Sequence, residues 1–233
     1  DFGKEVNVDY TELIKKLKGV DVVVFVGGLS TTLEGEEMPV SYPGFKGGDR
    51  TNIDLPSVQR NCLKALKQAG KKVVFVNCSG SAIALTPETE SCDAILQAWY
   101  AGEVGGTAVA DVLFGDYNPS GKLPITFYKS SDQLKDFEDY SMKGRTYRFM
   151  DDALFPFGYG LSYTTFSIGN AKFNKTSVNK GDSLVLNIPV TNAGKKNGTE
   201  IVQVYVRKAN DTDGPLKTLK GFQRLSVSAG KTA

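Results

Sequence analysis

Three glutamates within four positions, Glu34, Glu36 and Glu37, are the residues whose types and spacing best suit acid–base chemistry. The sequence contains no histidine, so Ser-His-Asp triads, Cys-His pairs and histidine-based zinc sites are excluded within it. Acid–base chemistry must therefore rest on carboxylates, Lys, Tyr or Cys. A solvated acidic loop without chemistry is the simpler alternative, and composition alone favours it.

The elements that must position these glutamates alternate between helix and strand. Apolar spacing predicts helices at 10–18, 57–69 and 107–114 and apolar strands at 20–26, 73–76 and 94–100. This alternation predicts an α/β fold with a parallel-rich sheet flanked by helices, a flavodoxin-like α/β sandwich. Ligand contacts gather after the carboxyl ends of such strands. The loops concerned are 27–49, 77–86 and 101–106.

Two features of these loops have competing explanations. Asp49-Arg50 closes the long acidic loop, where it either pins the returning chain or forms a surface ion pair of about 0–1 kcal/mol. The glycine-rich turn Gly102–Gly106 precedes a predicted helix but matches no phosphate-binding motif and lacks its Lys. We expect those glycines to serve close packing of the helix on a strand.

The second half of the sequence changes character. A polar, charged segment begins near Lys129 and predicts a linker. Beyond Ser162, alternating segments at 183–191 and 201–207 flank a turn-rich stretch, which predicts a small antiparallel sandwich.

Charge and composition limit the partners and cofactors. A formal net charge of +2, with both signs interspersed, does not predict nucleic-acid binding. The sequence has no apolar run of about 18 residues, so it predicts no membrane span. Asp1–Lys4 lacks a signal-peptide pattern, so we expect the start to be internal to a longer chain. Cys62, Cys78 and Cys92 form no C-x-x-C pair and are expected to be buried thiols. We expect neither metal nor cofactor.

Several idiosyncratic stretches together resemble family 3 glycoside hydrolases of the β-xylosidase and β-glucosidase type, and the resemblance spans nearly the whole chain. The matching stretches are Leu33–Glu36 with Asp49-Arg50, Leu55-Pro56 with Gln59, Ala98–Ala108, Asp111–Pro124, Gly144–Arg148, Phe155–Tyr163, Val190–Asn192, Val202–Tyr205 and Lys220–Phe222.

The resemblance implies a division of labour. Family members have an N-terminal barrel with an Asp nucleophile, an α/β sandwich with the acid/base Glu, and a fibronectin type III-like domain. This chain resembles the C-terminal part of that layout: residues 1–128 in the α/β domain, 129–157 as linker, and 158–233 in the fibronectin type III-like domain, truncated at its end. No segment resembles the barrel, so we expect the chain alone to be inactive.

The resemblance also implies the site. The loop pattern of β-xylosidase-like members places the acid/base role on Glu36, and residues 37–48 look like an insertion that keeps Glu34 and Glu37 as alternatives. The implied reaction is retaining hydrolysis of β-linked oligosaccharides or aryl glycosides, with β-xylosides favoured over β-glucosides. The implied location is secreted or periplasmic.

Two other functions compete with this one. A non-catalytic carbohydrate-binding or structural module would use the terminal sandwich, although Trp99 and Tyr100 end an apolar strand where aromatic residues ordinarily pack. A nucleotide-binding α/β protein is disfavoured because the phosphate motif is missing.

Overall fold

The protein is represented by a computed structural model, which describes residues 7–233. Asp1–Lys4, on which the prediction of an internal start rests, lie outside the described residues. The chain forms two compact units, one built from residues up to Val109 together with Ile125–Phe157, and one from Ala110–Pro124 together with Gly158–Ala233.

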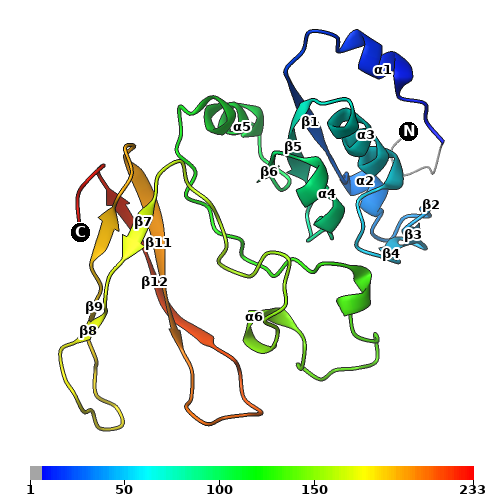
Figure 1. Cartoon of the computed structure of the whole chain (residues 1–233). Coiled ribbons are helices and arrows are strands. Elements are labelled where there is room, and N and C mark those ends of the chain that lie inside the picture. The colour runs from blue at the N-terminus through cyan, green and yellow to red at the C-terminus, as the bar shows by residue number, and fades with distance from the viewer. Residues whose placement is uncertain (1–6) are drawn as a thin grey trace. The chain divides into compact units, whose positions relative to one another are not determined.

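The first unit is built on a parallel sheet, which confirms the predicted α/β class. Its strands lie in the order β1 (Val22–Gly28), β5 (Lys72–Cys78) and β6 (Ala94–Gln97) (Figure 1). The helices are α1 (Thr11–Lys16), α2 (Thr31–Glu34), α3 (Ser57–Gln68), α4 (Thr86–Ser91), α5 (Gly105–Phe114), η1 (Ser131–Gln133) and α6 (Thr146–Phe149). The strand predicted at 94–100 is shorter than expected, because Trp99 has a left-handed φ of 58° that a strand does not accommodate.

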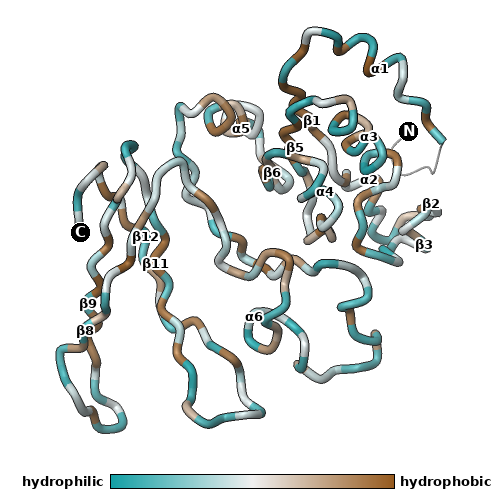
Figure 2. Tube along the Cα trace, viewed as in Figure 1, coloured by the Kyte–Doolittle hydropathy of each residue, from teal (hydrophilic) through white to brown (hydrophobic). Residues whose placement is uncertain are grey.

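Helix α3 covers one face of this sheet. Phe25 and Phe75 meet edge to face on the covered side, with ring centroids 5.8 Å apart, and Leu63 and Leu66 of α3 are fully buried. The other face of β1 carries Val22, Val24 and Val26, whose exposed fractions are 52%, 48% and 65%. Figure 2 shows the hydrophobic character of β1.

The end of β1 is fixed by a buried glutamine of α3. The Gln59 side chain accepts a hydrogen bond from the Gly28 N–H at 2.7 Å and donates one to the Gly28 carbonyl at 2.8 Å. Gly27 must lack a side chain here, because a Cβ would lie 2.5 Å from Gln59 Oε1. Gln59 therefore sets the point from which the acidic loop departs.

Replacing Gln59 by Leu should lower the free energy of unfolding by about 2–6 kcal/mol, because two buried backbone groups of Gly28 would lose their partners at about 1–3 kcal/mol each. Urea denaturation of the full chain measures the loss. The control is Gln68→Leu at the exposed end of α3, which should stay within about 0.5 kcal/mol of the parent. Equal effects of the two changes would contradict this role.

The glycine-rich turn before α5 differs from the expectation. Helix α5 begins at Gly105, inside the turn. A Cβ added at Gly102 or Gly106 would meet nothing within 4 Å. Close packing of helix on strand is therefore the wrong explanation for these two glycines.

The part of the second unit from Gly158 onward is all-β, as predicted, while Ala110–Pro124 contributes the end of helix α5. Its strands are β7 (Phe166–Ile168), β8 (Lys172–Phe173), β9 (Leu186–Asn187), β10 (Val190–Asn192), β11 (Gly198–Val206) and β12 (Thr218–Val227). They pair antiparallel as β7 with β10, β8 with β9, and β11 with β12. The strand predicted at 183–191 is divided into β9 and β10 around Pro189, which has no N–H to donate.

The core of the second unit is small and apolar. Val190, Val202 and Val227 are buried at its centre, with Phe166, Ile188 and Leu225 packed against them. No helix within residues 7–233 has both the length and the apolar composition needed to cross a membrane.

Candidate active site

Three loops at the carboxyl edge of the parallel sheet converge on Glu34. Glu34 ends α2, just after β1; Ser81 follows β5; and Tyr100 follows β6. Tyr100 Oη donates to Glu34 Oε2 at 2.9 Å, and Ser81 Oγ donates to Oε1 at 3.3 Å. Both carboxylate oxygens of the half-buried Glu34 thus accept hydrogen bonds. Two of the loops expected to hold a site, 27–49 and 77–86, meet there, and the third contact comes from Tyr100, just before the expected loop 101–106.

Tyr100 is suited to act as a donor in this cluster. Burial, together with the hydrogen bond to Glu34 and the charge of that residue, raises the pKa of Tyr100 to about 12. The hydroxyl therefore keeps its proton across the physiological range. Gly80 leaves room for the ring, since a Cβ there would lie 2.8 Å from Tyr100 Cε2.

Arg50 ties the returning end of the acidic loop to the same place. Its guanidinium donates to Ser81 Oγ at 3.1 Å and to the carbonyls of Asn52 at 3.1 Å, Ala82 at 3.4 Å and Asp54 at 3.4 Å. Burial lowers the pKa of Arg50, and the charge of Glu34 opposes that shift. Arg50 therefore pins the loop by bonding to the loop after β5.

Asp49, the partner suggested by the sequence, has a smaller role. It is exposed, and its carboxylate accepts a hydrogen bond from the Arg50 backbone N–H at 2.7 Å. The side chain of Arg50 is directed to the other groups just described. Of the pair, the arginine anchors the loop and the aspartate shapes its own turn.

Glu36 and Glu37 lie in the turn that follows α2. Gly35 ends the helix in the left-handed conformation, with φ of 60°, and Glu37 has φ of 57°. Both glutamate side chains are exposed, and within residues 7–233 neither has a recorded side-chain hydrogen bond or ion pair. Their carboxylates are free to meet a ligand.

The segment between these glutamates and Arg50 folds back on itself. Strands β2 (Ser41–Tyr42), β3 (Phe45–Lys46) and β4 (Asp49–Arg50) form an antiparallel meander, the β2–β4 meander. Its buried side chain is Phe45, 4% exposed. A Cβ on Gly48 would lie 2.9 Å from the Gly35 carbonyl and 3.0 Å from the Glu37 amide nitrogen. The meander therefore returns Arg50 to the turn that carries Glu36.

The cysteines do not add a second reactive group. Cys62 and Cys92 are buried, Cys78 is half-buried, and all are free thiols. Burial raises the pKa of each, to about 12 for Cys92. Thiols of this kind are poor nucleophiles near neutral pH, because the thiolate is the reactive form.

Two protein-family models match this chain. The model of the glycosyl hydrolase family 3 C-terminal domain matches residues 4–163, and a fibronectin type III-like domain model matches residues 200–233. This chain belongs to glycosyl hydrolase family 3. The family 3 resemblance inferred from the sequence motifs is thereby confirmed.

Two curated relatives are named as glycosidases. A xylan 1,4-beta-xylosidase of Xylanibacter ruminicola is 66% identical over the whole of this chain, which covers 27% of that protein. A periplasmic beta-glucosidase of Salmonella typhimurium is 38% identical over 94% of the chain, which covers 29% of that protein. The chain thus spans less than a third of the length of these two relatives.

Solved structures of beta-glucosidases share the fold. A beta-glucosidase of Bifidobacterium adolescentis superposes with a TM-score of 0.82 at 31% identity, and the match covers 99% of this chain and 35% of that one. A beta-glucosidase of Erythrobacter marinus gives a TM-score of 0.80 at 35% identity, with 95% of this chain and 30% of that one covered.

Ser81 and Tyr100 are the site residues that sequence reasoning missed. Tyr100 lies in a stretch quoted for the family resemblance but was assigned to packing, whereas its hydroxyl holds Glu34. Its neighbour Trp99 does pack, with its ring centroid 6.2 Å from that of Phe127. The available signal was position, since Ser81 lies in the predicted loop 77–86 and Tyr100 is the last residue of the strand predicted at 94–100.

Proposed function

We propose that this chain supplies the general acid/base carboxylate for retaining hydrolysis of β-glycosides. The nucleophilic Asp would come from a barrel region that this sequence does not contain. We assign the acid/base role to Glu36 and keep Glu34 and Glu37 as alternatives. The observation that carries the proposal is the exposed Glu36 on a turn that Glu34, Gly48 and Arg50 hold at the carboxyl edge of the sheet.

Glu36 and Glu34 differ in how well they suit the role of proton donor. A retaining glycosidase needs a proton donor about 5–5.5 Å from its nucleophile, so the donor must be able to approach the bond that breaks. Glu36 is exposed and unengaged within the described part of the chain. Glu34 already accepts from Tyr100 and Ser81, an arrangement that suits holding the loop in place.

The names of two relatives support a substrate class and a location for the proposed enzyme. The 66% identical relative is named a xylan 1,4-beta-xylosidase, which supports β-xylosides over β-glucosides, as oligosaccharides or aryl glycosides. The periplasmic beta-glucosidase among the relatives supports an exported or periplasmic protein. The partner of the chain would be the barrel domain of the same enzyme.

A chimera tests the proposal. This chain would replace the matching 27% of the Xylanibacter ruminicola relative, and the product is called the reconstituted enzyme. It should hydrolyse an aryl β-xyloside with retention of configuration, faster than the matching aryl β-glucoside, while the 233-residue chain alone should show no turnover. A folded but inactive chimera, or turnover by the chain alone, would contradict the proposed division of labour.

A further inference from the structure

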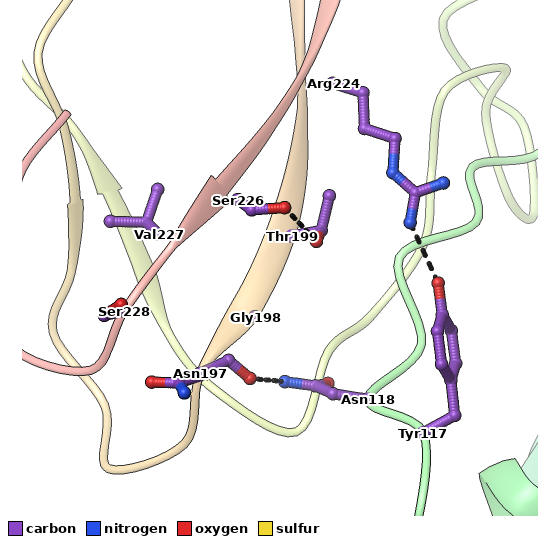
Figure 3. A pocket seen from close by; sticks show the side chains of 9 residues that line it. All are labelled: Tyr117, Asn118, Asn197, Gly198, Thr199, Arg224, Ser226, Val227 and Ser228. Atoms are coloured by element: carbon purple, nitrogen blue, oxygen red, sulfur yellow. Dashed lines mark hydrogen bonds between the residues drawn. The ribbon is translucent and has the colours of Figure 1, made fainter.

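The second unit contains a polar groove that the proposed hydrolysis does not use. This Arg224 groove has a volume of about 370 Å³ and is lined by residues 117–118, by the start of β11 and by the end of β12 (Figure 3). Its polar side chains include Tyr117, Asn118, Thr199, Arg224 and Ser226. Their hydroxyl, amide and guanidinium groups can donate or accept hydrogen bonds, which suits a polyhydroxylated ligand.

Arg224 is held in place from one side. Its Nη2 donates to Tyr117 Oη at 2.9 Å and to Ser120 Oγ at 3.3 Å. Both recorded hydrogen bonds of Arg224 within residues 7–233 use this one nitrogen, and no carboxylate among those residues is recorded in an ion pair with it. The remaining donors of the guanidinium are left for a ligand, and a guanidinium fork matches a carboxylate bidentately.

The opposite wall of the groove offers hydroxyl groups on a rigid support. Thr199 and Ser226 are directly paired across β11 and β12, with their hydroxyl oxygens 3.0 Å apart. Asn118 closes the end of the groove, because its Nδ2 donates to the Asn197 carbonyl at 2.9 Å and its Oδ1 accepts from Ser162 Oγ at 2.8 Å. Figure 3 shows Tyr117 and Arg224 on one side and the Thr199–Ser226 pair on the other.

We propose that the Arg224 groove binds an acidic sugar, with the sugar carboxylate on Arg224 and sugar hydroxyls on Thr199 and Ser226. A single unpaired cation beside several hydroxyls fits a uronic acid, which carries one negative charge and a ring of hydroxyl groups. The volume lies near the lower end of the range of about 300–1,000 Å³ for ligand sites, which suits a mono- or disaccharide. This binding requires no turnover, so it stands or falls independently of the proposed hydrolysis.

Titration of the full chain with glucuronate, followed by amide chemical shifts and calorimetry, tests the site. Glucuronate should bind saturably and perturb the amides of Thr199 and Ser226. Glucose lacks the carboxylate and acetate lacks the hydroxyls, so each should bind at least tenfold more weakly. If glucose binds as tightly as glucuronate, the groove is a neutral-sugar site and the assignment to an acidic sugar is overturned. If acetate or sulfate binds as tightly as glucuronate, the groove is a simple anion site and the assignment is likewise overturned.

Variants locate the binding. Arg224→Gln should weaken glucuronate at least tenfold, and Arg224→Lys, which keeps the charge without the fork, should fall between Arg224→Gln and the parent. Arg207→Gln is the matched control, an exposed arginine in the same unit, and should bind as the parent does. Ser226→Ala provides a second test from the opposite wall if Arg224→Gln unfolds. If Arg224→Gln folds and binds glucuronate as tightly as the parent does, the proposal is overturned. If Arg224→Gln unfolds, unchanged glucuronate affinity in Ser226→Ala overturns it.

Discussion

Replacing Glu36 by Gln in the reconstituted enzyme is expected to slow the hydrolysis of xylobiose by about 10²–10⁴-fold, the usual contribution of a positioned acid or base. A sugar leaves as a poor anion, so its oxygen must be protonated as the bond breaks. A dinitrophenyl β-xyloside leaves as a stable anion and does not need that proton. Formation of the covalent intermediate from this substrate should therefore slow less than about tenfold. Hydrolysis of the intermediate needs the same residue as a base, so we expect the intermediate to accumulate and dinitrophenolate to be released in a burst.

The neighbouring glutamates separate this role from its alternatives. Glu37→Gln is the matched control, one residue away and equally exposed, and should leave both substrates unaffected. Glu34→Gln should slow both substrates by a similar factor, because it disturbs the contacts with Tyr100 and Ser81. If dependence on the leaving group appears instead in Glu34→Gln or Glu37→Gln, the acid/base role moves to that residue. If Glu36→Gln slows formation of the covalent intermediate equally for both substrates, the assignment to Glu36 fails.

Replacing Glu88 by Gln should lower the free energy of unfolding by about 3 kcal/mol, the lower end of the roughly 3–5 kcal/mol lost when one partner of a buried ion pair is removed, because Arg60 is 25% exposed. The Glu88 side chain is only 1% exposed, and Arg60 holds it with both Nε at 2.7 Å and Nη2 at 3.3 Å. Asp54, 3.5 Å from Arg60 Nη1, offsets part of the loss. Urea denaturation of the full chain is the measurement.

Two comparisons show whether the buried charge is the cause. Glu90→Gln changes an exposed glutamate of the same helix α4 and should stay within about 0.5 kcal/mol of the parent. The double change Arg60→Met with Glu88→Leu should recover much of the stability lost in Glu88→Gln, because an apolar pair of similar volume removes both charges together. A Glu88→Gln protein as stable as Glu90→Gln would show that the pair contributes little.

The fold was predictable where the apolar pattern was regular. The runs that predicted β1 and β5, and the helical spacing that predicted α3, gave the correct elements to within a few residues. The pattern failed where backbone geometry decided the outcome. Trp99 ends β6 by adopting a left-handed φ, and Pro189 separates β9 from β10, and neither event changes the apolar spacing.

The candidate site was predictable only in part. The acidic loop and the sheet edge followed from the position of Glu34 after a predicted strand, and the proposed role of Glu36 came from the family resemblance. Contacts between loops distant in the sequence leave no local pattern, so the partners of Glu34 were not foreseen. The bond from Tyr100 to Glu34 joins residues 66 positions apart, and an aromatic residue at a strand end is ordinarily a packing residue.

The β2–β4 meander has a consequence for how this loop can vary. Because Gly48 touches the turn at Gly35–Met38, the excursion departs and rejoins at nearly the same point. Lengthening a surface excursion whose ends already meet costs only about 0.6 kcal/mol per doubling of its length. Residues can therefore be inserted into or removed from the β2–β4 meander at small cost in folding free energy, as long as Arg50 keeps its hydrogen bond to Ser81.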